Sequence, residues 1–109
     1  MATNYKGSFK TGWNQREIHA DMKMAAAAKL GTICTIGTDT LTPLTAAPAA
    51  NTKYAMIAQS DDTLGDGHVP VEYRDWNYSD VVAASSSVKK HVAYYIVTLD
   101  DVTVSSYTA

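Results

Sequence analysis

The side chains best able to do chemistry are scattered along the chain. The histidines are His19, His68 and His91, and the only cysteine is Cys34. Zinc sites bring three or four ligands together at recognisable spacings, and none of these histidines has a second histidine or a cysteine at such a spacing. We therefore expect no metal site and no cofactor. Cys34 lies among threonine and isoleucine, surroundings that indicate a buried thiol and not a reactive thiolate.

Acidic and hydroxyl side chains give no catalytic pattern either. The aspartates within 61–66 lack the alternate ligand order and the distant glutamate of a calcium-binding loop, so they indicate a turn. The serines at 85–87 lack the G-x-S-x-G motif that exposes a nucleophile. Nothing in the spacing of Glu72 with Asp75 or Asp80 requires an acid–base pair. The sequence therefore predicts that the protein is not an enzyme.

Aromatic side chains are the more informative group. Such side chains are enriched at interfaces when they carry a polar tip, because they bury much area at low entropic cost and still satisfy a hydrogen bond. Three lie near the N-terminus and three in the second half of the chain. The candidate partner-interface residues are Tyr5, Phe9, Trp13, Tyr73, Trp76 and Tyr78.

Composition limits the size of the fold and the kinds of partner. A chain of 109 residues has room for one domain. Hydrophobic residues make up 46% of it, but 16 of them are alanine, so the core is thin and we expect a homo-oligomer. A net charge of −2 lacks the positive footprint that nucleic-acid binding needs. Residues 22–37 are interrupted by Lys23 and Lys29 and fall short of a membrane span, so we expect neither nucleic acid nor membrane as a partner.

The N-terminal third predicts an arm followed by a helix. Residues 1–13 show neither helical nor strand periodicity, which indicates an extended arm outside the domain. Asn14 and Glu17 have the spacing of a capping box, an alanine run follows, and Gly31 stands where a left-handed cap belongs. The pattern therefore predicts a helix over about 15–30. The alternative is an extended segment, if tertiary contacts override the propensity of alanine.

After Gly31 the hydrophobic pattern changes to a period of two. It predicts strands over 32–36, 54–59 and 91–99, of which 54–59 is apolar on both faces and hence central. Residues 38–52 combine two prolines with threonine and alanine, a composition typical of a surface loop. Val102 and Val104 extend or re-pair the last strand, and 105–109 should fray.

These elements together predict a mainly β fold, either a small β-sandwich or a barrel-like sheet, with one N-terminal helix and an extended N-terminal arm. The arm would be 1–13, and a single β-rich domain would occupy 14–109. Because the strands form the core without the arm, we expect its deletion to leave the fold intact.

Residues 56–82, MIAQSDDTLGDGHVPVEYRDWNYSDVV, resemble the head decoration or head-fibre proteins of tailed bacteriophages. The features that carry the resemblance are a strand, a D-G turn, the V-P-V-E-Y-R run and a Y-S-D step, preceded by an L-T-P-L loop and a flexible arm. In that family, small β-rich proteins sit on the outer capsid surface, commonly as trimers at local three-fold positions. The helix over 15–30 departs from the loose β-sandwich form of this group.

The resemblance implies a structural virion protein that is made in the bacterial host cytoplasm and binds the exterior of the phage capsid. Its partner would be the major capsid protein, whose subunit contacts it would stabilise, and the arm would lie across a capsid subunit or add a strand to it. The alternative function is a small carbohydrate- or peptide-binding β module, in which Tyr73, Trp76 and Tyr78 form a stacking surface.

Overall fold

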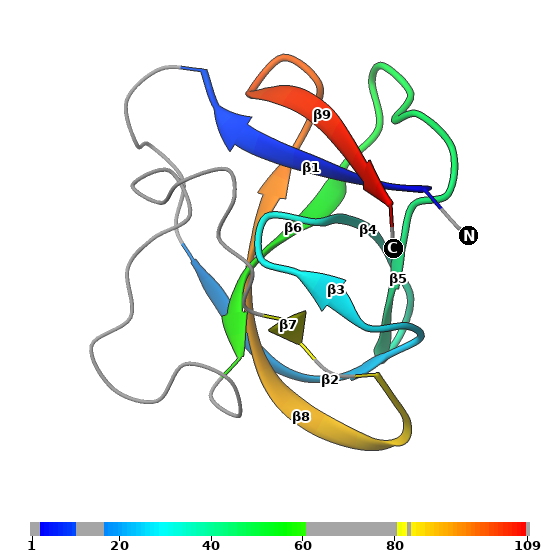
Figure 1. Cartoon of the computed structure of the whole chain (residues 1–109). Coiled ribbons are helices and arrows are strands. Elements are labelled where there is room, and N and C mark those ends of the chain that lie inside the picture. The colour runs from blue at the N-terminus through cyan, green and yellow to red at the C-terminus, as the bar shows by residue number, and fades with distance from the viewer. Residues whose placement is uncertain (1–2, 11–16, 61–80, 83, 109) are drawn as a thin grey trace.

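The computed structural model describes residues 3–10, 17–60, 81–82 and 84–108 (Figure 1). Within these ranges the chain forms strands and contains no helix. The strands are β1 (Thr3–Phe9), β2 (Ile18–Met24), β3 (Ala28–Lys29), β4 (Ile33–Ile36), β5 (Thr40–Pro43), β6 (Tyr54–Ser60), β7 (Val81–Val82), β8 (Ser85–Val97) and β9 (Val102–Thr108). The prediction of a mainly β fold is therefore confirmed.

Strands β2, β5, β4, β6 and β8 follow one another around a closed barrel. All neighbours in the barrel are antiparallel except β2 and β5, whose short parallel pairing joins Lys23 to Thr40 and Met24 to Leu41. The Lys23 ammonium lies 3.5 Å from a carboxylate oxygen of Asp39. A hydrogen bond from Thr40 and the charge of Lys23 hold the pKa of Asp39 below its usual value.

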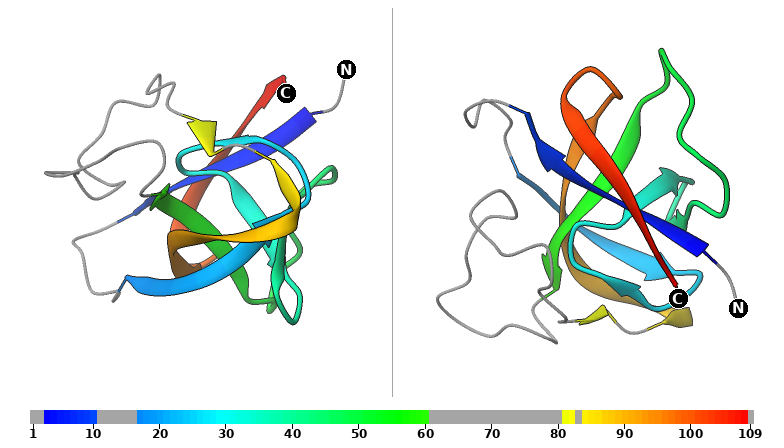
Figure 2. Two further views of the ribbon diagram at one scale, coloured as in Figure 1. Left: turned by 90° about the horizontal axis from the view of Figure 1, so that it is seen from below. Right: turned by 45° about the horizontal axis from the view of Figure 1, so that its top comes forward.

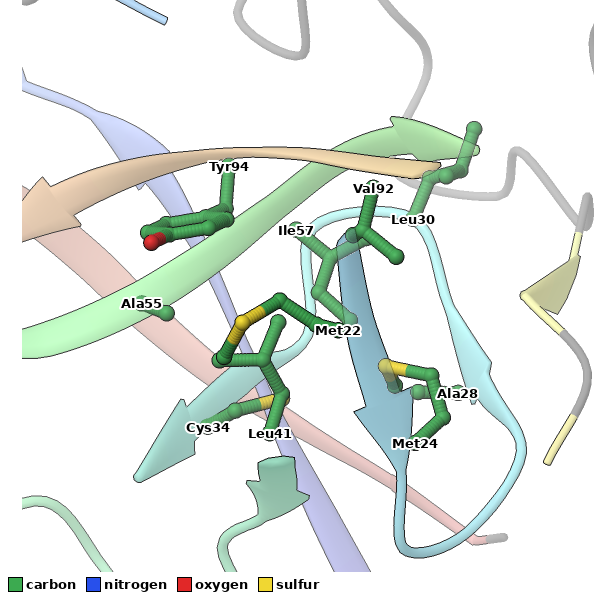
Figure 3. Close-up of a cluster of buried hydrophobic side chains, with 10 residues drawn as sticks. All are labelled: Met22, Met24, Ala28, Leu30, Cys34, Leu41, Ala55, Ile57, Val92 and Tyr94. Carbon is green, nitrogen blue, oxygen red and sulfur yellow. The ribbon is translucent and has the colours of Figure 1, made fainter. Parts of the chain in front are cut away.

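The interior of the barrel is the first of two cores (Figure 3). Alternation along β2 supplies it, because Met22 and Met24 point inward while Asp21 and Lys23 lie on the outer face. Each of the other four barrel strands adds at least one buried side chain. The cluster consists of Met22, Met24, Ala28, Leu30, Cys34, Leu41, Ala55, Ile57, Val92 and Tyr94.

The second core lies on the outer face of β4, β6 and β8. Strands β1 and β9 pair as an antiparallel two-stranded sheet, here called the terminal ribbon, and cover that face (Figures 1 and 2). The buried residues of this cluster are Ile33, Tyr54, Met56, Ala58, Ala93, Tyr95, Val97 and Val102. Burial on both faces explains why β6 and β8 are apolar at consecutive positions, and it confirms the prediction that 54–59 is a central strand.

The helix predicted over 15–30 is wrong, since this segment contains β2 and β3. Helix propensity is a weak preference that tertiary packing overrides, and the alternation of Met22 and Met24 with outward polar residues matches the period of a strand. Gly31 does adopt the left-handed conformation, with φ 89°. It occupies the third position of a turn over 29–32, closed by a hydrogen bond from the Thr32 amide to the Lys29 carbonyl of 3.1 Å.

Two further predictions about the chain ends and loops are corrected. The surface loop predicted over 38–52 contains β5, whose last residue is Pro43. Proline has no amide hydrogen to donate, but the next amide, that of Leu44, donates to the Ile33 carbonyl of β4. The fraying predicted for 105–109 does not hold for 105–108, which lie in β9. The strand predicted over 91–99 is found as β8, which begins earlier and ends at Val97.

The arm predicted over 1–13 is also corrected for residues 3–9, which form β1. Each residue of β1 pairs with one of β9, from Thr3 with Thr108 to Phe9 with Val102. This pairing joins the two ends of the chain, a contact that local periodicity does not encode. Removal of β1 would uncover the second core, so the structure does not support the expectation that the fold survives loss of the arm.

Burial makes Cys34 a probe of unfolding. Its side chain is fully buried in the barrel, and desolvation raises the pKa of its thiol to about 12. At pH 8 only about one folded molecule in 10⁴ then carries a thiolate, whereas about one quarter of exposed cysteines, with a pKa of about 8.5, would be ionised at that pH. Labelling with a thiol-specific disulfide reagent at pH 8 should therefore be slow and should accelerate with urea in step with unfolding. Complete labelling within seconds under native conditions would contradict this burial.

The raised pKa of Cys34 determines whether its contribution to stability rises or falls with pH. A thiol with a raised folded-state pKa contributes stability that is present below the unfolded-state pKa and is lost as the pH rises toward the folded-state value. Cys34 should therefore favour folding below about pH 8.5 and lose this contribution between about pH 8.5 and 12. Comparison of urea unfolding for the native chain and Cys34→Ala at several pH values measures it, because the difference between the two should shrink over this range.

Close approach of β1 to the second core makes Gly7 sensitive to substitution. A Cβ atom there would lie 3.0 Å from Met56 Sδ. It would also lie 3.3 Å from Ile33 Cδ1 and from Val102 Cβ. Gly7→Ala should cost about 1 kcal/mol of unfolding free energy and Gly7→Val about 3 kcal/mol, although valine favours strands. Urea unfolding measures both, with Ser8→Val as the control from the opposite face of β1. Equal stability of the two valine variants would contradict this packing.

Candidate functional site

Two of the six predicted interface residues, Tyr5 and Phe9, lie in the terminal ribbon. Phe9 is half-buried and packs against the second core, with its ring edge-to-face on Tyr95 at 5.1 Å between centroids and 82° between planes. Its ring is therefore already used in the second core. Tyr5 is half-buried four residue pairs further along β1. Four predicted interface residues lie outside the described residues, namely Trp13, Tyr73, Trp76 and Tyr78.

The turn over 29–32 joins the barrel to the terminal ribbon. On the barrel side, the Gly31 amide donates to the Ile57 carbonyl at 2.7 Å, and the Ile57 amide donates to the Thr32 carbonyl at 2.9 Å. On the ribbon side, the Gly7 amide donates to the Gly31 carbonyl at 2.9 Å. Lys6 and Thr32 form a β-bridge beside it. The backbone of this turn therefore fixes where β1 crosses the barrel.

Tyr107 in β9 fastens the same turn through its hydroxyl group. The Lys29 amide donates to the Tyr107 oxygen at 3.1 Å, and Asn4 Nδ2 donates to it at 3.2 Å. Thr32 Oγ1 donates its proton to the Lys29 carbonyl at 2.6 Å. In the 2.6 Å contact between Thr32 Oγ1 and the Tyr107 hydroxyl, Tyr107 is therefore the donor. The hydroxyl thus uses its one proton and both acceptor positions.

Two lysines flank the ring of Tyr107. The ammonium of Lys6 lies 5.6 Å from the ring centroid and that of Lys29 lies 5.1 Å from it. Both distances are within the range of cation–π attraction. Lys6 is buried, with 7% exposure, so its methylene groups are also shielded from water. The ends of the chain are therefore held by polar contacts at one end of the ribbon and by apolar packing at the other.

The outer edge of β9 has the properties of a strand that accepts a partner. Edge strands of soluble proteins are normally protected by charged residues, proline or bulges. The sequence of β9, VTVSSYT, holds no charged residue and no proline, and its pairing with β1 runs without a shift in register. Within the described ranges β9 pairs with β1 alone. Thr103, Ser105, Ser106 and Thr108 are exposed along this strand.

A second group of functional side chains lies where β2 and β8 adjoin on the outer face of the barrel. His19 Nδ1 and His91 Nε2 are 2.9 Å apart, and the two rings tilt by 32°. His19 Nε2 lies 2.9 Å from a carboxylate oxygen of Glu17, whose other oxygen accepts a hydrogen bond from the Tyr95 hydroxyl at 3.3 Å. His91 Nδ1 lies 3.9 Å from Asp21. The side chains of His19 and His91 are 43% and 38% exposed.

Sequence reasoning missed this pairing because the two histidines are 72 residues apart. The cross-strand register that brings them together, with Asp21 opposite His91 and His19 opposite Ala93, follows from barrel closure. An alternating pattern in 18–24 was the one signal that would have placed His19 on an outer strand face. The third histidine, His68, lies outside the described residues.

Larger ligand sets and membrane-spanning helices are absent from the described part of the chain. No three His, Cys, Asp or Glu side chains in that part are grouped to hold a metal ion. No helix there has the length and apolar character needed to cross a membrane. Comparisons with protein-family models, with curated proteins and with solved structures found no match.

The hydroxyl of Tyr107 should contribute measurably to stability. Tyr107→Phe keeps the ring near the two lysines but leaves Asn4, Thr32 and the Lys29 amide without their common partner. We expect a loss of about 1–3 kcal/mol in the free energy of unfolding, the cost of leaving such groups unsatisfied. Tyr5→Phe is the matched control, since the Tyr5 hydroxyl has no hydrogen bond to the described residues. Equal urea midpoints for the two variants would contradict the role given to Tyr107.

Proposed function

We propose that this protein binds the outer surface of a tailed-phage capsid and stabilises contacts between major capsid subunits. The observation that carries the proposal is the outer edge of β9, which holds no charged residue or proline and pairs with β1 alone within the described residues. An added strand gains main-chain hydrogen bonds along the whole edge, and the alternate side chains set its register. The resemblance of residues 56–82 to head decoration proteins gives the partner.

The absence of charged residues in β9 favours a partner strand that binds through its main-chain hydrogen bonds. Its exposed side chains are threonine and serine, which neither repel an incoming strand electrostatically nor demand a particular charge on it. Tyr107 and the turn over 29–32 hold the ribbon in place before the partner arrives. Such preorganisation lowers the entropy cost of binding.

Assembly of several copies strengthens an attachment of this kind. We infer a homo-oligomer, with a trimer at a local three-fold position of the shell as the favoured form. Three β9 edges held in one assembly would bind by avidity, which adds on the order of 10² or more to the affinity of one edge. The protein would then dissociate slowly and act as a clamp without any chemical step.

The alternative, a carbohydrate- or peptide-binding module, depends on a stacking surface of Tyr73, Trp76 and Tyr78. These residues lie outside the described part of the chain. No contact or exposed aromatic group among the described residues favours that function over capsid binding.

Charged substitutions on β9 test the proposal. Thr103→Lys combined with Ser106→Lys places one ammonium on each face of the edge strand, at exposed positions opposite Ser8 and Tyr5. Lysines protect edges against strand addition, so the double variant should keep its melting temperature and bind undecorated capsids about tenfold more weakly or worse. Occupancy is measured by cosedimentation with capsids assembled from the major capsid protein of the same phage.

A matched variant separates the effect of charge from that of position. Thr38→Lys combined with Ala46→Lys adds the same charge at exposed positions outside the strands and should bind like the native chain. Native binding by the β9 variant would exclude this edge as the attachment site. Failure of the native chain to bind the capsids at any concentration would contradict the capsid function itself.

A further inference from the structure

We propose that His19 and His91 form a binding site for a divalent transition metal ion on the outer face of β2 and β8. The site does not depend on the proposed capsid function. It rests on the separation of two imidazole nitrogens and on the carboxylates that face the other nitrogen of each ring. Both features are common in histidine-ligated metal sites.

The distance between the facing nitrogens fits two ligands of one ion. Metal–nitrogen bonds to histidine are about 2.0–2.1 Å long. Half of the 2.9 Å separation divided by that bond length is about 0.7, which is the sine of half the angle between the two bonds at the metal. The two bonds would therefore meet at about 90°. That angle belongs to adjacent positions of a square-planar or octahedral ion. Both side chains are more than one third exposed, so an ion in solution has access to the two facing nitrogens.

The neighbouring carboxylates assign the protons as a metal site requires. His19 Nε2 donates to Glu17 at 2.9 Å, which leaves His19 Nδ1 as the acceptor of the bridge from His91 Nε2. A metal ion would replace that bridging proton, which would move to His91 Nδ1, where Asp21 faces it at 3.9 Å. Both rings would then have a metal on one nitrogen and a carboxylate facing the other, the arrangement common around histidine ligands.

The second contact of Glu17 fixes its position. The hydroxyl of Tyr95, a fully buried residue, donates to Glu17 at 3.3 Å. Glu17 is 18% exposed, so it is the most enclosed member of the site. It therefore acts as a positioning residue for His19, and the carboxylates of Glu17 and Asp21 offset the charge of a bound divalent ion.

The donor set favours copper and nickel over zinc. Imidazole suits all three ions, but adjacent positions near 90° match tetragonal Cu²⁺ and Ni²⁺ better than tetrahedral Zn²⁺. No third His, Cys, Asp or Glu ligand joins the pair among the described residues, so water would complete the coordination. We expect affinity in the order Cu²⁺, then Ni²⁺, then Zn²⁺.

Titration of the full chain, free of any affinity tag, with each metal salt tests the site. Isothermal calorimetry should give one Cu²⁺ ion per chain. Amide NMR signals near His19 and His91 should broaden first, while those of β9 should stay sharp. His19→Ala and His91→Ala should each weaken binding more than tenfold, and Glu17→Gln should weaken it by about 10–100-fold with an unchanged stoichiometry.

His68→Ala is the control for the loss of one histidine, and it should bind the metal like the native chain. Thermal melting shows whether each variant is folded, and the exposure of both ligands makes the alanine variants suitable. Native affinity in the His19 and His91 variants would overturn the proposal. So would an equal loss in the His68 variant, or broadening that spreads evenly over the chain.

Discussion

The rest of the structure depends on the backbone hydrogen bonds of the turn over 29–32. The Gly31 amide donates to β6 and the Gly31 carbonyl accepts from β1, so one residue links the barrel to the terminal ribbon. Because only a residue tolerant of φ near 89° fits this position, glycine is required there. The ribbon that the turn positions then covers the outer face of β4, β6 and β8. Without that cover, side chains as large as Tyr95 and Met56 would face water.

The parts of the fold that the sequence predicts are those with strong local patterns. Strand β4 and the second half of β8 are rich in β-branched and aromatic residues, which correctly indicates strands. The apolar run of β6 correctly indicates a strand buried on both faces. Cys34 was expected to be a buried thiol, and it is fully buried. The special conformation of Gly31 was also expected, although it was assigned to a helix end. These features need only neighbouring residues to be recognised.

The parts that the sequence does not predict depend on contacts between distant residues. Asn4 and Tyr107 are 103 residues apart. They lie opposite each other in the pairing of β1 with β9, through which both ends of the chain form strands. The alanines of 25–28 favour a helix in isolation, but the burial of Met22 and Met24 in the barrel outweighs a preference worth a fraction of a kcal/mol per residue. The histidine pair escaped notice for the same reason, since only the register of β2 against β8 joins its members.

Tyr95 connects the terminal ribbon to the histidine pair. Its ring packs against Phe9 of the ribbon, and its hydroxyl donates to Glu17, which in turn holds His19. Packing of the ribbon on the second core therefore fixes the tyrosine, and the tyrosine fixes the carboxylate beside the histidine pair. A loosened ribbon would release Glu17 as well as the β9 edge. The outer face of β8 is thus a single structural unit, in which the burial that stabilises the fold also orients the polar groups exposed at its margin.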